Sequence, residues 1–234
     1  MTGLVYKEWK QNRWFILSMI PCGFAPLLAL LLLREQITSV DNIALRIGGL
    51  IAGFLAAGAL QLLVLRGDDR KLWGYWITAT ADGYKGFLRV KYEMIFGMIV
   101  LFLFSLQFVD IGYCAVAADM GSEDIGSISS IALLLGFMQI LFRAIDIPFT
   151  YRFGSKKGSF IKLICMVTLA IILGAVLIVS AEHIEHIIET ARDLFSQNSS
   201  LILSVGLVVC LVLYYLSYRI TCKLYLKGVE QYDS

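Results

Sequence analysis

RGDDRKLWGYWITATADGYKGFLRVKYE, residues 66–93, is a charged and aromatic-rich stretch that separates two long apolar segments. It is too short to fold as a soluble domain, since domains below about 40 residues usually need cross-links or metals. It is also too rich in Trp, Tyr and charged residues to be a plain flexible linker. The stretch therefore predicts a structured connection between two membrane-spanning segments.

The composition of the whole chain is that of a membrane protein. Of the 234 residues, 59% are hydrophobic and 16% are charged, and the mean hydropathy is +0.77. Typical soluble domains contain roughly 45–50% apolar and about 25% charged residues. The chain is therefore too apolar for a soluble globular protein, and we expect no nucleic-acid partner.

Six apolar segments are long enough to cross about 30 Å of hydrocarbon as helices. None shows the period-2 alternation of a barrel strand, and helices satisfy every backbone polar group within lipid. We therefore predict an all-α membrane protein and a single transmembrane domain over residues 1–234. The six predicted spans are residues 14–33, 43–65, 92–113, 128–149, 160–179 and 201–220.

The Lys and Arg residues between the spans and near the span ends are distributed unequally between the two sides. Seventeen fall on the side that carries both termini and only three on the other. Cytoplasmic segments are enriched in Lys and Arg, so we predict that both termini are cytoplasmic. The three on the outer side are Arg34, Arg46 and Arg192.

The N-terminal segment and the first span each carry a local signal. Trp9 and Trp14 alternate with basic residues, which favours an amphipathic helix in the inner interface over a frayed tail. Pro21 and Pro26 predict a bend in the first span, because proline removes a helical hydrogen bond.

The second span carries small residues one helical turn apart at Gly49, Gly53 and Ala57. Such a stripe lets another helix backbone approach closely. The sequence leaves open whether the second helix belongs to the same chain.

Arg143 and Asp146 lie near the inner end of the fourth span, and their i, i+3 spacing places them on one helical face. Ionisable groups in a span suggest a functional site, here a point on a substrate path. The alternative is an ion pair at the helix end, with Arg143 reaching toward the interface.

Residues 66–93 also carry the best candidate for an interaction site. We expect Gly67 to end the second span and Asp68 to cap a short cytoplasmic helix. Buried aromatics and Arg dominate protein interfaces, whereas an inner belt of aromatics that touches only lipid is the alternative. The candidate residues are Asp69, Arg70, Lys71, Leu72, Trp73, Tyr75 and Trp76.

The sequence offers no catalytic or metal-binding motif. The five cysteines are single, and His183 and His186 are the only histidines. The run GSKKGS at residues 154–159 lacks the spacing of a phosphate-binding loop. We therefore expect neither a metal nor a cofactor in this chain.

Several short features together point to a known family. They are Lys7-Glu8 before the first span, the charged turn 66–71 followed by Trp73 and Trp76, Lys91-Tyr92, and the run Pro-x-x-Tyr-x-Phe-Gly-x-Lys-Lys-Gly at 148–158. With these features the chain resembles the short six-helix permease subunits of bacterial ATP-binding-cassette exporters. Relatives commonly carry Leu-Pro and Ser after the Trp, where this chain has Ile-Thr-Ala-Thr at 77–80.

The resemblance implies a homodimeric permease in the bacterial cell membrane that docks a separate ATPase on residues 66–93. ATP and Mg²⁺ would be bound by that ATPase. The nearest subgroup is the exporters of phenol-soluble modulins and antimicrobial peptides, which implies an amphipathic or hydrophobic substrate moved outward.

Two other function classes fit a chain with several membrane spans. An ion-driven secondary transporter, or another stand-alone multispan protein, is the first alternative; it would need charges deep in the bundle and an inverted repeat, and neither is evident. An intramembrane enzyme would need a nucleophile and base, or metal-binding motif, within a span. The transporter with a separate ATPase is therefore the expected function.

Overall fold

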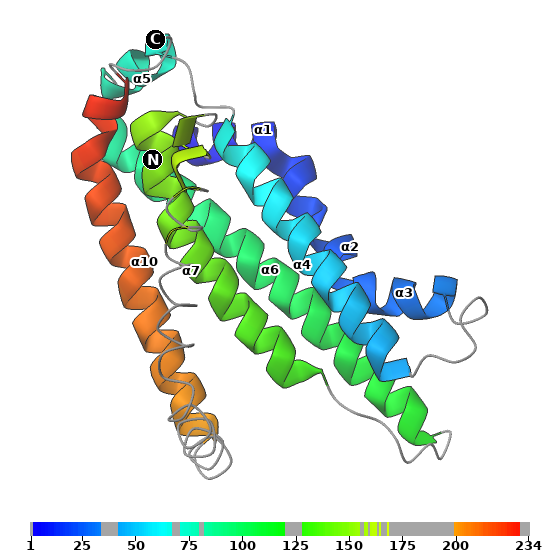
Figure 1. Cartoon of the computed structure of the whole chain (residues 1–234). Helices are drawn as coiled ribbons and strands as arrows, with labels where there is room; N and C mark the ends of the chain where they lie inside the picture. Colours follow the sequence, from blue (N-terminus) through cyan, green and yellow to red (C-terminus); the bar gives the residue numbers. More distant parts are fainter. Residues whose placement is uncertain are drawn as a thin grey trace. The chain divides into compact units, whose positions relative to one another are not determined.

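A computed structural model gives the fold and describes residues 2–33, 42–66, 71–79, 82–119, 128–154 and 199–229, together with 157, 158, 160–162, 164 and 168 (Figure 1). Within these residues the chain is helical, with no strand. The helices are α1 (Thr2–Leu17), α2 (Met19–Gly23), α3 (Ala25–Leu33), α4 (Asn42–Arg66), α5 (Lys71–Thr78), α6 (Gly83–Asp119), α7 (Ser129–Phe153) and α10 (Ser199–Val229). The predicted all-α class is confirmed.

Four of the described helices are long and apolar enough to cross a membrane, and a bent helix pair gives a fifth. The four are Ala44–Arg66, Gly83–Cys114, Ser129–Phe153 and Leu203–Lys227. They correspond to the second, third, fourth and sixth predicted spans. Most of the fifth, 160–179, lies outside the described residues. The count of six and the side on which the termini lie stay predictions.

The chain divides into two compact units, Met1–Phe142 and Arg143–Ser234, which are described one at a time. The single domain predicted for residues 1–234 stays a prediction.

The bent pair lies at the start of the first unit. The segment Gly3–Gly23 meets Ala25–Leu33 at 54°, close to Pro26. Proline fits the first turn of a helix, where its missing N–H has no helical partner. The bend predicted for the first span is therefore present. Helix α1 runs without a break past Trp14 to Leu17. The start of the first span at Trp14 and the position of the residues before it in the inner interface stay predictions.

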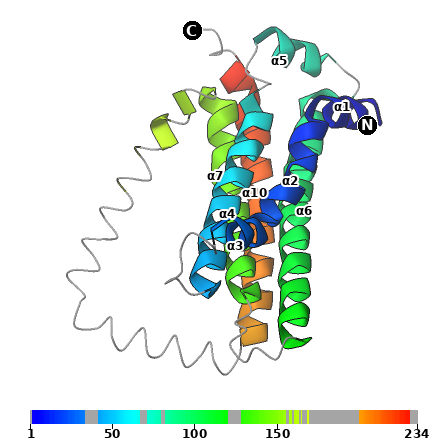
Figure 2. The ribbon, with the colours of Figure 1, turned by 90° about the vertical axis from the view of Figure 1, so that its right-hand side faces the viewer.

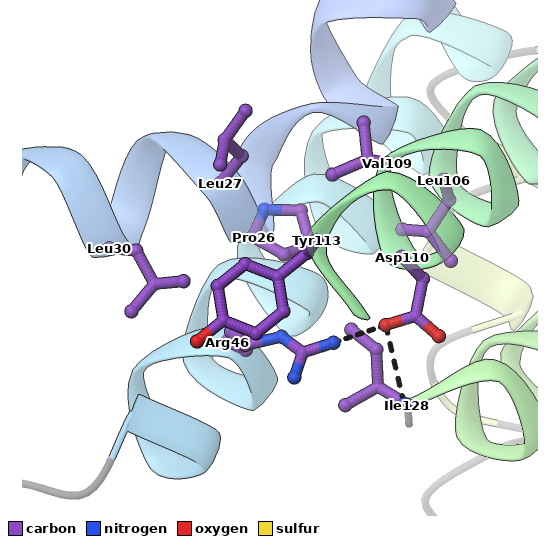
Figure 3. Close-up of a pocket in the computed structure, with 9 residues that line it drawn as sticks. All are labelled: Pro26, Leu27, Leu30, Arg46, Leu106, Val109, Asp110, Tyr113 and Ile128. Carbon is purple, nitrogen blue, oxygen red and sulfur yellow. Dashed lines mark hydrogen bonds and ion pairs between the residues drawn. The ribbon is translucent and has the colours of Figure 1, made fainter. Parts of the chain in front are cut away.

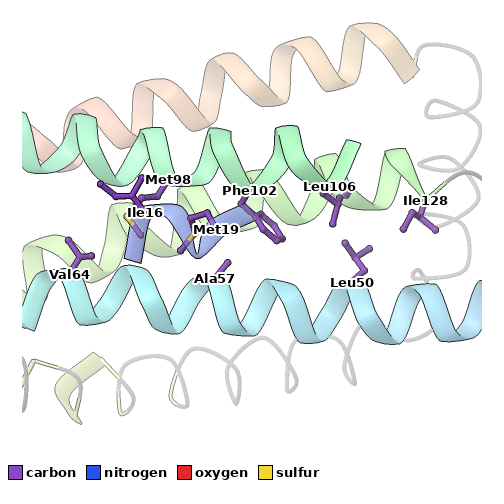
Figure 4. Packing of buried hydrophobic residues seen from close by; sticks show 10 residues of the cluster. Ile16, Met19, Leu50, Ala57, Val64, Met98, Phe102, Leu106 and Ile128 are labelled. Carbon is purple, nitrogen blue, oxygen red and sulfur yellow. The ribbon is translucent and has the colours of Figure 1, made fainter. Parts of the chain in front are cut away.

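The core of the first unit forms where α2 packs between α4 and α6 (Figure 4). Met19 of α2 lies between Ala57 of α4 and Phe102 of α6, with Leu50 farther along α4, and all four side chains are fully buried. A side chain at Gly23 would collide with Ser105 of α6. The close approach of α2 therefore depends on small residues.

Helix α6 begins well before the predicted third span. It starts at Gly83 rather than at Tyr92, so the second half of the stretch 66–93 is helix and not a connection. Gly83 adopts a left-handed φ of +59°, a conformation that glycine tolerates best. The N–H of Gly86 then donates to the carbonyl oxygen of Asp82 at 3.1 Å. Phe87 and Leu88 are fully buried, so this first part is held by packing.

The second unit contains the last part of α7 and α10, which run parallel. Ser217 Oγ donates to the carbonyl oxygen of Ala144 at 2.5 Å. Farther along, the rings of Tyr151 and Tyr225 have centroids 5.6 Å apart. Numbering rises together along both helices, so both end on the same side.

Candidate functional site

Helix α5 is the short helix predicted between the second and third spans. It contacts α6, and it lies at the same end as the start of α6 and the end of α4 (Figure 2). The N–H of Ala79 donates to the carbonyl oxygens of Tyr75 and Trp76, which closes the last turn. A separate short helix therefore crosses this end of the first unit.

Helix α5 has one packed side and one exposed side. Ile77 is fully buried, whereas Tyr75 is 48% and Trp76 57% exposed. Large aromatic rings that remain exposed at the end of a helix bundle are suited to bind a protein partner. Of the other predicted residues here, the side chains of Lys71, Leu72 and Trp73, and all of Asp69 and Arg70, lie outside the described parts.

A buried ion pair lies at the same end of the unit. Lys91 Nζ of α6 donates to Glu8 Oε2 of α1 at 2.6 Å, and the two side chains are 0% and 1% exposed. The same ammonium group donates to the carbonyl oxygen of Val64 at 3.4 Å, near the end of α4. One lysine therefore joins α1, α4 and α6 beneath the connection that carries α5.

The carboxylate of Glu8 accepts three side-chain hydrogen bonds. Besides Lys91, Asn12 Nδ2 donates to Oε2 at 3.0 Å and Lys7 Nζ donates to Oε1 at 2.7 Å. A carboxylate buried among such donors holds its charge and its position. Glu8 and Lys91 are 83 residues apart, so no helical periodicity could pair them. The only sequence signal was their presence among the short features shared with the permeases.

A second buried ion pair lies near the other end of the first unit (Figure 3). Arg46 Nη2 of α4 donates to Asp110 Oδ1 of α6, and the guanidinium carbon lies 4.2 Å from the ring centroid of Tyr113. The N–H of Ile128 donates to the same Asp110 oxygen at 3.4 Å. Pro26, Leu27, Leu30, Leu106 and Val109 complete the lining of a small pocket. The pair is shielded by apolar side chains and ties α4 to α6.

Between the two ion pairs, two buried glutamines connect α4 and α7. Gln61 Nε2 donates to Gln139 Oε1 at 3.2 Å, and Gln139 Nε2 donates to the carbonyl oxygen of Phe54 at 3.3 Å. Amide hydrogen bonds of this kind hold helices together where no water competes.

The small residues of the second span face another helix of the same chain. A side chain at Gly49 would meet the carbonyl oxygen of Ala25 at 2.6 Å, and one at Gly53 would collide with the carbonyl of Cys22. Ala57 is fully buried in the core. The stripe Gly49, Gly53 and Ala57 is therefore covered by α2 and α3, which answers the question that the sequence left open.

Arg143 and Asp146 form an ion pair in the second unit. Arg143 Nη1 lies 2.9 Å from Asp146 Oδ2, and Lys162 Nζ donates to Asp146 Oδ1 at 2.5 Å. Arg143 is only 5% exposed, so it packs among other side chains. The predicted pair on one helical face is therefore present, and its role, on a substrate path or at the helix end, stays a prediction. The carbonyl oxygen of the neighbouring Ala144 accepts a hydrogen bond from Ser217 of α10, which places one face of this turn of α7 against α10.

The described part of the chain contains no candidate metal-binding site, because no three His, Cys, Asp or Glu side chains come together there. His183 and His186 lie outside that part.

Comparison with known families gives a match over the later part of the chain. The model of a family described as "ABC-2 family transporter protein" matches residues 89–226, which is more than half of the 234 residues. The matched region begins two residues before Lys91 and contains α7 and most of α10. No curated protein matches the chain, and no solved structure does.

Proposed function

Because this chain belongs to the ABC-2 family of transporter proteins, it is the membrane permease subunit of an ATP-binding-cassette transporter, and we propose that it exports an amphipathic substrate with a separate ATPase docked on α5. Peptide toxins and antimicrobial peptides are the proposed substrates. The proposed assembly is a homodimer of the permease in the bacterial cell membrane, with an ATPase bound at its cytoplasmic side.

The exposed aromatic side of α5 is the observation that carries the docking proposal. Tyr75 and Trp76 are exposed on a helix that is itself anchored by the buried side chain of Ile77. An interface gains most of its free energy from a few large aromatic anchors that enter pockets of the partner. Helix α5 also contacts α6 directly. A displacement of α5 by the docked ATPase would therefore reach α6.

The proposed transporter requires an external source of energy. The 234 residues contain no G-x-x-x-x-G-K-[ST] motif, the loop that cradles nucleotide phosphates in P-loop ATPases. The ATPase that the proposal requires therefore supplies both the nucleotide site and Mg²⁺.

The proposal is tested by recovering the complex from native membranes. Affinity-tagged permease carrying Tyr75→Ala and Trp76→Ala should lose the co-purifying ATPase, identified by mass spectrometry. Trp14→Ala is the matched control, because Trp14 is also an exposed Trp, 68% accessible, on a different helix. The control should retain the ATPase.

Two outcomes would contradict docking on α5. One is an ATPase that stays bound to the Tyr75 and Trp76 variants, which would place these rings against lipid. The other is equal loss in the Trp14 control, which would point to a general effect on folding or insertion.

A further inference from the structure

The cluster of Arg143, Asp146 and Lys162 in the second unit has more positive than negative charge. Two cationic groups contact the carboxylate of Asp146: Arg143 Nη1 lies 2.9 Å from Oδ2, and Lys162 Nζ lies 2.5 Å from Oδ1. With both bases charged, the three side chains carry a net charge of +1. A buried charge that its neighbours do not neutralise is costly, so such a site favours the arrival of an anion.

Arg143 also has donors that Asp146 does not use. Within the described residues, the buried Nε and Nη1 atoms of Arg143 have no acceptor in hydrogen-bond geometry. Asp146 Oδ2 is close to Nη1 but is not aligned with its N–H bonds. The planar guanidinium is suited to bind two oxygens of one phosphate or carboxylate.

The described residues of the second unit supply no other carboxylate for these cations. They contain seven Lys and Arg residues and a single acidic residue, Asp146. This described part of the second unit is therefore strongly basic. Basic sites between helices on the cytoplasmic side of membrane proteins bind anionic lipid head groups.

The chain reversal after α7 explains how Lys162 reaches the site. Gly154 ends α7 with a left-handed φ of +77°. Gly158 then packs so closely on α7 that a side chain there would meet the carbonyl oxygen of Phe149 at 2.7 Å. The two glycines of the motif at 148–158 thus bring Lys162 back along α7 to Asp146.

Apolar side chains next to the cluster in the sequence are exposed. Ile145 of α7 is exposed, as are Phe160 and Ile164 next to Lys162 in the sequence. A phospholipid could place its phosphate on the cations while its acyl chains cover these side chains. A free phosphate ion would gain nothing from them.

We propose that Arg143 and Lys162 form a binding site for the phosphate of an anionic phospholipid on the cytoplasmic side of the second unit. Asp146 positions both cations and competes with the phosphate for them. The site is independent of ATPase docking, so its test needs neither ATPase nor transport.

The test uses the purified full-length permease, stripped of lipid in detergent and then given phosphatidylglycerol or phosphatidylcholine. Native mass spectrometry counts bound lipid, and a thermal melt reports stabilisation. We expect Arg143→Gln and Lys162→Gln each to weaken phosphatidylglycerol binding about tenfold, since each removes a charge-assisted hydrogen bond. Lys157→Gln and Arg219→Gln, which remove exposed bases of the same unit, are the matched controls and should bind as the unaltered chain does.

Asp146→Asn separates lipid binding from a purely structural ion pair. If the carboxylate competes with phosphate, its removal should tighten phosphatidylglycerol binding even where it lowers the melting temperature without lipid. Weaker binding in this variant would overturn the proposal. This variant also keeps the test decisive if Arg143→Gln fails to fold.

Three further results would overturn the lipid site. They are equal binding of the two phospholipids, an equal loss in all four Lys and Arg variants, and displacement of phosphatidylglycerol by millimolar inorganic phosphate. The last would assign the site to a free phosphate. Displacement by an amphipathic peptide with a free carboxylate, but not by its amidated form, would assign the site to the substrate instead.

Discussion

Lys91 Nζ lies 2.6 Å from Glu8 Oε2, and this contact joins the first helix of the chain to the start of α6 with both side chains fully screened from solvent. The pair lies at the end of the first unit that carries α5, whose exposed rings are the proposed docking surface. If α5 moved and displaced α6, the movement would therefore also reach α1, because the Lys91–Glu8 ion pair joins α6 to α1.

We predict that the Glu8–Lys91 pair contributes strongly to stability. Glu8→Gln and Lys91→Met each leave one buried charge behind, and breaking a buried pair costs about 3–5 kcal/mol. The double variant Glu8→Gln with Lys91→Met removes both charges and should recover much of that loss. Thermal melts of the four proteins in one detergent provide the measurement.

Arg89 and Glu93 supply the control for this prediction. They form an i, i+4 ion pair of similar length, 2.8 Å, on the same helix, but both side chains are more than half exposed. Exposed pairs contribute about 0–1 kcal/mol, so Arg89→Gln should leave the melting temperature nearly unchanged. An equal drop in melting temperature for the variants of the buried and the exposed pair would show that burial does not strengthen the Glu8–Lys91 pair.

A second prediction concerns the packing of α4 on α2 and α3. Gly53→Leu should destabilise the protein by about 1–3 kcal/mol or more, because overpacking forces backbones apart. Gly48→Leu is the matched control, since a Cβ atom added at Gly48 would meet nothing within 4 Å. Melting in detergent compares the two, and a Gly53→Leu protein as stable as the Gly48 variant would show that α2 does not lie on this face.

The positions of the four long membrane helices along the chain were largely predictable from the sequence. Apolar length located the four long spans, and Pro26 marked the bend in the first. The start of α6 was missed because hydropathy detects where a helix enters hydrocarbon and not where it begins. Residues 83–91 are polar enough to resemble a loop, and they are helical because Phe87 and Leu88 pack in the interior.

The contacts of the candidate sites were less predictable. The i, i+3 spacing of Arg143 and Asp146 was enough to predict a shared helical face, whereas Lys162 reaches Asp146 only through the chain reversal at Gly154 and Gly158. Glu8 and Lys91 meet through tertiary packing of helices far apart in the sequence. Such long-range contacts leave no local periodicity, so only the structure brings these residues together.

A third prediction concerns topology. In a cysteine-free background, single cysteines at Asp119 and Glu189 should react with an impermeant thiol reagent in intact cells. Cysteines at Lys71 and Lys157 should react only after permeabilisation. The expectation follows from the unequal distribution of Lys and Arg. A reversed pattern at any one of the four positions would contradict six spans with cytoplasmic termini.

The last prediction separates anchors from surrounding charges in ATPase docking. Truncation of a buried aromatic anchor typically costs about 2 kcal/mol or more of binding, whereas a charge at the rim alters mainly the association rate and its salt dependence. Trp73→Ala and Trp76→Ala should therefore weaken ATPase binding at every salt concentration and abolish substrate-stimulated hydrolysis. Arg70→Ala and Lys71→Ala should slow association at low salt and approach the unaltered protein as salt rises, because added ions screen the charges that these variants lack. Association and dissociation rates of the purified ATPase on immobilised permease provide the measurement. If the charge variants instead raise the dissociation rate as much as the Trp variants do, the basic residues are buried in the contact and the aromatic anchors do not dominate it.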